Sequence, residues 1–249
     1  MACSSRPSPR PLERSFFFPA ADVVAPRLLG KLIVRRTPAG EQRARVVETE
    51  AYTGALDPAA HAFRGLTPRT AVLYGEPGHA YVYFIYGMHW CLNVSTRPAG
   101  QAGGVLFRAA QIVGEAPAPL SGPGRLTRAL AITGALNGCD LTRPGPLFLA
   151  DDGCTPRSIA VTTRVGIRHA RHLPYRFFVE GARAVTAPRS PILARLPPAA
   201  ARPPFSGRPS AATPARQRTG GPSDGRAAAE TRSAAIRAPA AQGASKLPR

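Results

Sequence analysis

The chain contains very little lysine, tryptophan and acidic side chain for its length. Among 249 residues, only Lys31 and Lys246 are lysines, and 14 Asp and Glu stand against 33 Lys and Arg. The formal net charge is therefore +19, and arginine supplies nearly all of it. A balance this basic favours a polyanionic partner such as DNA, RNA or an anionic membrane. An arginine-rich proteome or a basic tail would produce the same balance.

Cysteine is also scarce, and apolar runs are short. The four cysteines are widely spread and form no CxxC pair, so we expect no zinc site and no disulfide framework. No long apolar core follows the basic residues at the start, and no run approaches the roughly 20 apolar residues of a membrane span. We therefore expect neither a signal peptide nor a membrane partner, and a reducing cytoplasm as the location.

The two ends of the chain differ in composition from its middle. Residues 1–15 are rich in Ser, Pro and Arg, and we expect them to be disordered. Residues 189–249 are mostly Ala, Pro, Arg, Ser and Gly, and they carry about half of the net charge. Such a segment buries too little apolar surface to offset its ordering entropy. We expect one folded domain over 16–188, followed by a basic disordered tail.

The middle of the chain alternates β-rich runs with Gly- and Pro-rich segments. Apolar periodicity and turn residues predict a helix over 22–29, strands over 32–36, 43–49 and 105–110, and a helix that begins after 122–124. The segment 51–76 is predicted as a long loop with one helical turn after Pro68. A long loop inside a compact domain is more often functional than not.

The strongest local signal is a pair of β-rich runs around a glycine. Residues 79–86 and 89–95 predict a β-hairpin. Tyr81 and Tyr83 share one face by the strand period of two, and packing in a core would explain them. Tyr86 lies at the turn, where we expect it to project. A projecting aromatic side chain on a basic protein suggests stacking on bases or wedging between them.

Carboxylates and histidines supply the other candidate groups. Glu48 and Glu50 close the strand 43–49 where the long loop begins, and a carboxylate there can act as a general base. Two glutamates after a strand are nevertheless more often solvated. His61 stands alone in the loop, where a surface role is the simpler interpretation. His169 and His172 form an isolated HxxH between arginines, which favours a basic surface over a metal site because no third ligand is evident.

Together these segments resemble the alkyladenine (3-methyladenine) DNA glycosylase family of mammals and many bacteria. The resemblance covers about Phe16 to Pro188. The glutamate motif and the tyrosine hairpin are specific in combination, whereas the segment after Phe178 and the tail depart from the family. The matching stretches are Leu28-Leu-Gly-Lys-Leu32, Val46-Val-Glu-Thr-Glu-Ala-Tyr52, Asp57 to His61, Thr67-Pro-Arg69, Tyr81-Val-Tyr-Phe-Ile-Tyr-Gly-Met88, Cys91-Leu-Asn-Val94, Val105-Leu-Phe-Arg108, Gly122-Pro-Gly-Arg-Leu126, Asn137-Gly138, Thr163-Arg-Val-Gly-Ile167 and Pro174-Tyr-Arg-Phe177.

The resemblance implies a mixed α/β fold of the α+β type: a single domain on a curved antiparallel sheet or barrel, with a protruding β-hairpin. It implies a base-excision-repair hydrolase that flips an alkylated or deaminated purine out of duplex DNA and leaves an abasic site. The expected bases are 3-methyladenine, 7-methylguanine, hypoxanthine and ethenoadenine. No cofactor and no metal are implied. The expected partner is double-stranded DNA, bound by a monomer at the nucleoid of a bacterium.

Four matching positions would act on the glycosidic bond and on the duplex. The resemblance implies that Glu50 deprotonates the attacking water and that Arg108 lies beside this water and the DNA backbone. Positive charge builds on the sugar as the bond breaks, and a nearby carboxylate stabilises that charge. Tyr86, with Met88 beside it, would fill the gap that the flipped base leaves in the duplex.

Four more positions would form the pocket for the flipped base. By the same resemblance, Tyr52, His61 and Tyr83 would stack against the base. Asn93 would lie at the pocket floor, where it would exclude the exocyclic amino group of normal guanine. An alkylated purine carries positive charge, which favours stacking between electron-rich rings.

Three other classes of protein compete with this hypothesis. The main alternative is a non-catalytic nucleic-acid-binding protein on the same fold, and the intact Glu50 and Asn93 argue against it. An RNA-binding or formyltransferase-like module is the second, and the tyrosine-tipped hairpin argues against that. A bifunctional glycosylase with lyase activity is the third. It needs an amine nucleophile, for which only Lys31 and Lys246 are available.

Overall fold

The computed structural model describes residues 8–114, 118–185 and 190–197. Three short α-helices accompany the strands: α1 (Ala21–Arg27), α2 (Ala71–Tyr74) and α3 (Pro123–Ala129). Single 3₁₀ turns lie at Arg14–Phe17, Gly54–Leu56, His61–Arg64 and Gly134–Leu136. The strands are β1 (Arg10–Pro11), β2 (Leu32–Thr37), β3 (Gly40–Tyr52), β4 (Ala80–Ile85), β5 (His89–Ser95), β6 (Gly104–Ile112), β7 (Pro119–Ser121), β8 (Leu147–Asp151), β9 (Ile159–Thr162), β10 (Arg176–Val179) and β11 (Ala194–Leu196).

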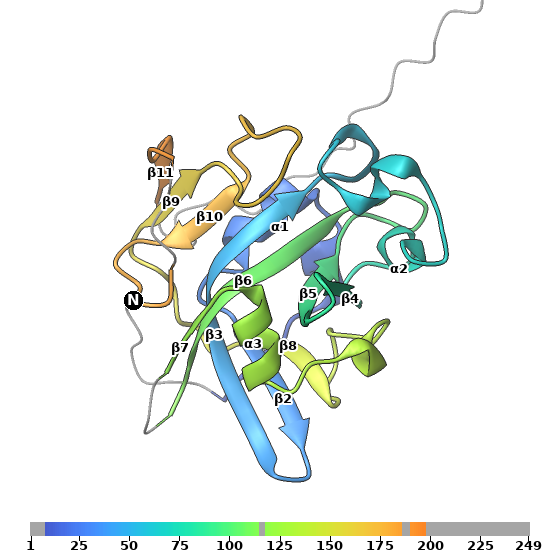
Figure 1. The fold of residues 1–249 in the computed structure, drawn as a ribbon. Helices are drawn as coiled ribbons and strands as arrows, with labels where there is room; N and C mark the ends of the chain where they lie inside the picture. The colour runs from blue at the N-terminus through green and yellow to red at the C-terminus, as the bar shows by residue number, and fades with distance from the viewer. Residues whose placement is uncertain (1–7, 115–117, 186–189, 198–249) are drawn as a thin grey trace, which may run out of the picture. The chain divides into compact units, whose positions relative to one another are not determined.

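All of these strands belong to one antiparallel sheet (Figure 1). One path through it runs β1-β8-β2-β3-β10-β9-β11, and a branch of β4, β5, β6 and β7 joins it where β6 pairs with β3. The expected mixed fold on an antiparallel sheet is confirmed. The sheet remains open at its edges, so the barrel form of that expectation is wrong.

Most predicted elements of the middle segment are present. The strands, the 79–95 hairpin and the helical turn after Pro68 all form. The first helix begins at Ala21, so Asp22 lies in its first turn rather than at the cap, and Gly30 follows it with a φ of 88°. The second helix spans Pro123–Ala129, so it begins within the segment 122–124 rather than after it. No helix in the described part of the chain is long and apolar enough to cross a membrane.

Ordered structure extends into both predicted disordered segments. Arg10 and Pro11 pair with Asp151 and Ala150 of β8, and β11 pairs with β9. The composition of these residues does not predict this pairing, because backbone hydrogen bonding to a strand edge depends little on side-chain composition. Residues 1–7, 189 and 198–249 of the two segments lie outside the described residues. Cys154 is disulfide-bonded, which the spacing of the cysteines did not predict.

The two faces of β3 have different neighbours. Helix α1 packs on β3, β6 and β10, whereas α3 packs on β5, β6 and β7 (Figure 1). The hydroxyl of Thr49 donates 2.9 Å to the carbonyl of Ala25 in α1, so this side of β3 faces α1. By the strand period of two, Glu48, Glu50 and Tyr52 face the opposite way. A β-bulge, marked by register shifts on either side of Glu48, interrupts the pairing with β6 at this point.

Candidate active site

Glu50 is fully buried and held by three groups. The Tyr52 hydroxyl donates 3.0 Å to its Oε2, the Val165 backbone N–H donates 2.8 Å to its Oε1, and Nη1 of Arg108 lies 3.5 Å from its Oε2. Burial raises the pKa of Glu50 above 4.5, although Arg108, Val165 and Tyr52 each act to lower it. A carboxylate with a raised pKa is a stronger base than an exposed glutamate.

Glu48 shares the same face of β3 and is also fully buried. Its Oε1 accepts from Nε of Arg108 at 3.0 Å and from Nε of Arg176 at 2.7 Å. Arg176 is 1% exposed and lies opposite Glu50 on β10. Two carboxylates and two guanidinium groups therefore form one buried cluster. The sequence presented Glu48 only as a neighbour of Glu50, and the Glu-x-Glu spacing was the available signal.

An aromatic cavity of about 520 Å³ lies in front of this cluster. The structure brings six predicted site residues together in its wall. Glu50 lies directly behind that wall, since Tyr52, Arg108 and Val165 all line the cavity and all contact the carboxylate. Met88 does not line it. The six residues are Tyr52, His61, Tyr83, Tyr86, Asn93 and Arg108.

Stacked rings form one side of the cavity. The ring centroids of His61 and Tyr83 lie 4.5 Å apart at 74°, and those of Tyr81 and Tyr83 lie 5.3 Å apart. Nδ1 of His61 hydrogen-bonds the Tyr81 hydroxyl at 2.9 Å. Removal of the His61 ring from water, and then the nearby Arg69, lower the pKa of His61, which keeps the ring neutral at pH 7. The resemblance had not assigned Tyr81 a role, yet its hydroxyl holds His61 in place.

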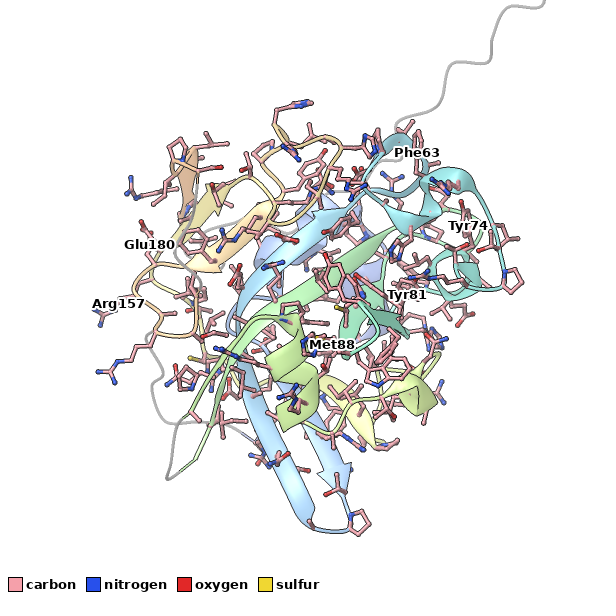
Figure 2. All side chains as sticks on the ribbon, viewed as in Figure 1. Phe63, Tyr74, Tyr81, Met88, Arg157 and Glu180 are labelled. Atoms are coloured by element: carbon pink, nitrogen blue, oxygen red, sulfur yellow. The ribbon has the colours of Figure 1, made fainter. Side chains whose placement is uncertain are left out.

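The tip of the β4–β5 hairpin projects beside the cavity. Tyr86 and Gly87 turn the chain with φ values of 54° and 65°, and Tyr86 is 78% exposed. Met88, labelled in Figure 2, is 66% exposed. A left-handed backbone at a residue other than glycine costs on the order of 1–3 kcal/mol and often marks a functional position. The predicted projection of Tyr86 is confirmed.

A second buried ion pair, which sequence reasoning missed, packs against the Tyr52 ring of the site. Arg164 and Asp57 have fully buried side chains and pair through both nitrogens of the guanidinium end. Arg164 also donates 2.9 Å to the carbonyl of Ala51, and its guanidinium carbon lies 4.7 Å from the centroid of the Tyr52 ring. Both residues stand in stretches that carry the family resemblance, which was the only signal for them.

The loop from β3 to β4 forms the outer rim of the cavity. Gly54 begins it with a φ of 82°, and a Cβ there would lie 2.1 Å from the carbonyl oxygen of Ala102. Only glycine permits this approach of the loop to the start of β6. Figure 2 marks Phe63 and Tyr74 on the same segment, where the Tyr74 hydroxyl donates 3.0 Å to the carbonyl of Ala62.

Other groups considered from the sequence lie apart from the cavity. Nζ of Lys31 pairs with Asp151 at 2.5 Å, just before β2, and Lys246 is outside the described residues. His169 and His172 are exposed. Within the ranges that the structure describes, no three His, Cys, Asp or Glu side chains gather as metal ligands, and no lysine lines the cavity.

Comparison with known proteins matches this sequence to one family. The model of the family described as methylpurine-DNA glycosylase (MPG) matches residues 15–183. A protein of Koribacter versatilis named "Putative 3-methyladenine DNA glycosylase" is 45% identical over 72% of this chain and 94% of its own length. Proteins of the same name from Frankia casuarinae and Burkholderia lata are 44% and 45% identical, over 68% and 71% of this chain and 88% and 91% of their own lengths.

This match places the chain among the DNA glycosylases. Such an enzyme hydrolyses the N-glycosidic bond between base and sugar. The chain belongs to the methylpurine-DNA glycosylase family, since the family model covers well over half of it.

Proposed function

We propose that this enzyme excises alkylated and deaminated purines from duplex DNA and leaves an abasic site. The expected bases are 3-methyladenine, 7-methylguanine, hypoxanthine and ethenoadenine. The observation that carries the proposal is the burial of Glu50 directly behind the wall of the aromatic cavity. The shared name of the three relatives supports 3-methyladenine as the first base to test.

Base flipping is the step that the hairpin serves. A base inside the duplex is out of reach of Glu50, so it must leave the stack at a cost of a few kcal/mol. Tyr86, at the hairpin tip, enters the space that the base leaves, with Met88 beside it. The flipped base then stacks on Tyr83, His61 and Tyr52. A neutral His61 favours a cationic alkylated base, because a protonated ring would repel it.

The hydrolysis uses the buried cluster. As the bond from the purine nitrogen to C1′ lengthens, its electron pair leaves with the base, and positive charge develops on the sugar. The Glu50 carboxylate stabilises that charge. It also accepts a proton from the water whose oxygen bonds to C1′. This water has to reach Glu50 where Tyr52, Arg108 and Val165 meet in the cavity wall.

Asn93 bears on which bases are excluded, and the placement of the lysines bears on whether lyase activity accompanies excision. Asn93 is 5% exposed, and its Nδ2 donates 3.1 Å to the carbonyl of Tyr81, so the amide is fixed in the cavity wall. We propose that it excludes the amino group of normal guanine. Because no lysine lines the cavity within the described ranges, the enzyme acts without a Schiff base, as a monofunctional glycosylase.

The decisive experiment uses purified full-length protein and short duplexes that each contain one of the four damaged bases. After incubation, hot alkali cleaves the strand at any abasic site, and the cleaved fraction measures excision. An undamaged duplex of the same sequence is the control. Cleavage without alkali would reveal a lyase. Tight binding to a damaged duplex without any excision would instead support the non-catalytic alternative.

A further inference from the structure

We propose that Glu48 is a positioning residue for base excision. It fixes the guanidinium of Arg108 between two carboxylates, so that Glu48 and Glu50 share the positive charge of Arg108. This inference rests on the proposed function of Glu50 as the base. Glu48 is not among the residues that line the cavity. It acts through Arg108.

The geometry of Arg108 carries the inference. Its Nε lies 3.0 Å from Oε1 of Glu48, and its Nη1 lies 3.5 Å from Oε2 of Glu50. The shorter and hydrogen-bonded contact is thus made to Glu48, although Glu50 is the group that reacts. Arg108 lies on β6 at the register shift, between Phe107, which pairs with Thr49, and Ala109, which pairs with Glu48, so strand pairing alone does not fix its side chain. The bond to Glu48 supplies the missing restraint.

The burial of the cluster makes this arrangement costly unless it has a use. Glu48 and Glu50 are fully buried, Arg176 is 1% exposed, and Oε2 of Glu48 has no hydrogen-bond partner among the described residues. A buried carboxylate oxygen without a partner is destabilising. A valine or leucine at this position would be buried at a lower cost in free energy. The carboxylate therefore serves a purpose other than stability.

That purpose is the balance of charge around Glu50. The cluster holds two carboxylates and two guanidinium groups. Arg108 contacts both carboxylates, so its positive charge does not neutralise Glu50 alone. A carboxylate paired closely with one arginine would be a weak base. Burial is the main cause of the raised pKa of Glu50, and Glu48 adds to it, because it draws Arg108 toward itself and places a like charge beside Glu50.

The groups that face Glu50 from its other neighbours include two, the Tyr52 hydroxyl and the Val165 N–H, that lower its pKa. All of the groups are Tyr52 from β3, Tyr83 and Cys91 from the hairpin, the Val165 N–H and Arg164 from the loop after β9, and Arg176 from β10. Arg164 is paired with Asp57, and Arg176 with Glu48. Glu48 is the single acidic side chain among the described neighbours that acts directly on Glu50.

The test is the pH profile of single-turnover excision by Glu48→Gln in the full-length enzyme. Loss of the like charge and release of Arg108 should lower the pKa of Glu50. The acid limb of the profile should therefore move to lower pH by about one unit. The plateau rate should fall on the order of ten- to a hundredfold, because the base is weaker and Arg108 is displaced. Glu41→Gln is the matched control, since Glu41 lies on the same strand and bridges Arg36 and Arg43 far from the cavity.

A purely structural role predicts a different result. It would lower the amount of folded enzyme, seen by thermal melting, and leave the midpoint of the acid limb unchanged. An unshifted midpoint in Glu48→Gln overturns the proposal. If that variant does not fold, Glu48→Asp keeps the charge but withdraws it from Arg108. It should lose at least about tenfold in plateau rate, and a wild-type rate overturns the proposal.

A titration separates this inference from the proposed function. The carboxyl carbon of Glu50 is followed by ¹³C NMR in the enzyme without DNA, assigned by comparison with Glu50→Gln. The Glu48→Gln variant should titrate at lower pH than the wild type, even if no damaged base is excised. Absence of excision by the wild type would refute the proposed function alone. An unchanged titration of Glu50 would refute the role of Glu48 alone.

Discussion

The backbone N–H of Val165 donates a 2.8 Å hydrogen bond to Oε1 of Glu50, across 115 residues of sequence. Arg164, the residue before it, is clamped by Asp57 beneath the ring of Tyr52. The loop after β9 is therefore fixed at one residue and oriented toward the carboxylate at the next. This loop has no regular secondary structure, and its bond to Oε1 orients the Glu50 carboxylate toward the cavity.

Replacement of Glu50 by glutamine should keep binding to damaged DNA and lower excision on the order of a hundredfold or more, because a positioned base is lost. The wild-type rate should rise with pH along an acid limb whose midpoint lies above 4.5, since burial raises the pKa of Glu50 and only its ionised form is a base. The variant should lack this limb. Single-turnover rates at several pH values test both points. Excision at the wild-type rate would show that Glu50 is not the base.

Replacement of Tyr86 by alanine should weaken retention on a damaged duplex. The gap left by flipping is then unfilled, and stacking of about 1–3 kcal/mol is lost. Binding assays and 2-aminopurine fluorescence beside the lesion measure the effect. Phe84→Ala is the control, because Phe84 is a partly exposed aromatic on the same hairpin that stacks on Trp90 away from the tip. Equal affinity and equal flipping in both variants would remove Tyr86 from the DNA interface.

Replacement of Asn93 by serine should relax the exclusion of normal guanine. The shorter side chain leaves room for the amino group and loses the bond to the Tyr81 carbonyl. Excision of guanine opposite thymine or cytosine should rise by about tenfold or more. Asn137→Ser is a suitable control, since Asn137 accepts from the Val82 N–H on the same hairpin but does not line the cavity. If guanine stays as resistant in Asn93→Ser as in the control, another residue excludes it.

Replacement of Asp57 by asparagine should leave the charge of Arg164 buried without a counter-charge. The free energy of unfolding should fall by about 3–5 kcal/mol, as for other broken buried ion pairs. The exposed pair of Glu41 and Arg36 gives the comparison, because Glu41→Gln should cost at most about 1 kcal/mol. Denaturant titration of both variants measures the difference. A similar small loss for both would mean that the buried pair adds nothing beyond a surface pair.

Removal of residues 198–249 should leave folding and chemistry intact and reduce affinity for undamaged DNA. The cut has to follow Pro197, because β11 pairs with β9 and an earlier end would remove a strand. The removed arginines can pair with phosphates and release counterions, so the log–log salt slope of binding should become shallower. A full-length version with these arginines changed to glutamine should behave like the truncation. The idea fails if the shortened chain unfolds or if its salt slope equals that of the full chain.

The sequence by itself determined the local elements and the residue types of the site. β-Rich runs on either side of Gly87 are enough to specify the β4–β5 hairpin and the projection of Tyr86, because the strand period and the turn are properties of neighbouring residues. The Glu-x-Glu spacing likewise placed both carboxylates on one face of β3. The roles given to Glu50, Tyr52, His61, Tyr83, Asn93 and Arg108 came from resemblance, and they stay predictions although these side chains gather at one cavity.

Only the tertiary structure decided which distant groups meet. Arg176 reaches Glu48 across 128 residues, and Arg164 reaches Asp57 across 107. These pairs depend on the register of β10 against β3 and on the path of the loop after β9, which local periodicity does not specify. The edge strands β1 and β11 could not be predicted from the sequence either, because backbone pairing to a strand edge depends little on side-chain composition. Burial of Glu50, and hence its strength as a base, follows from this assembly and not from any single segment.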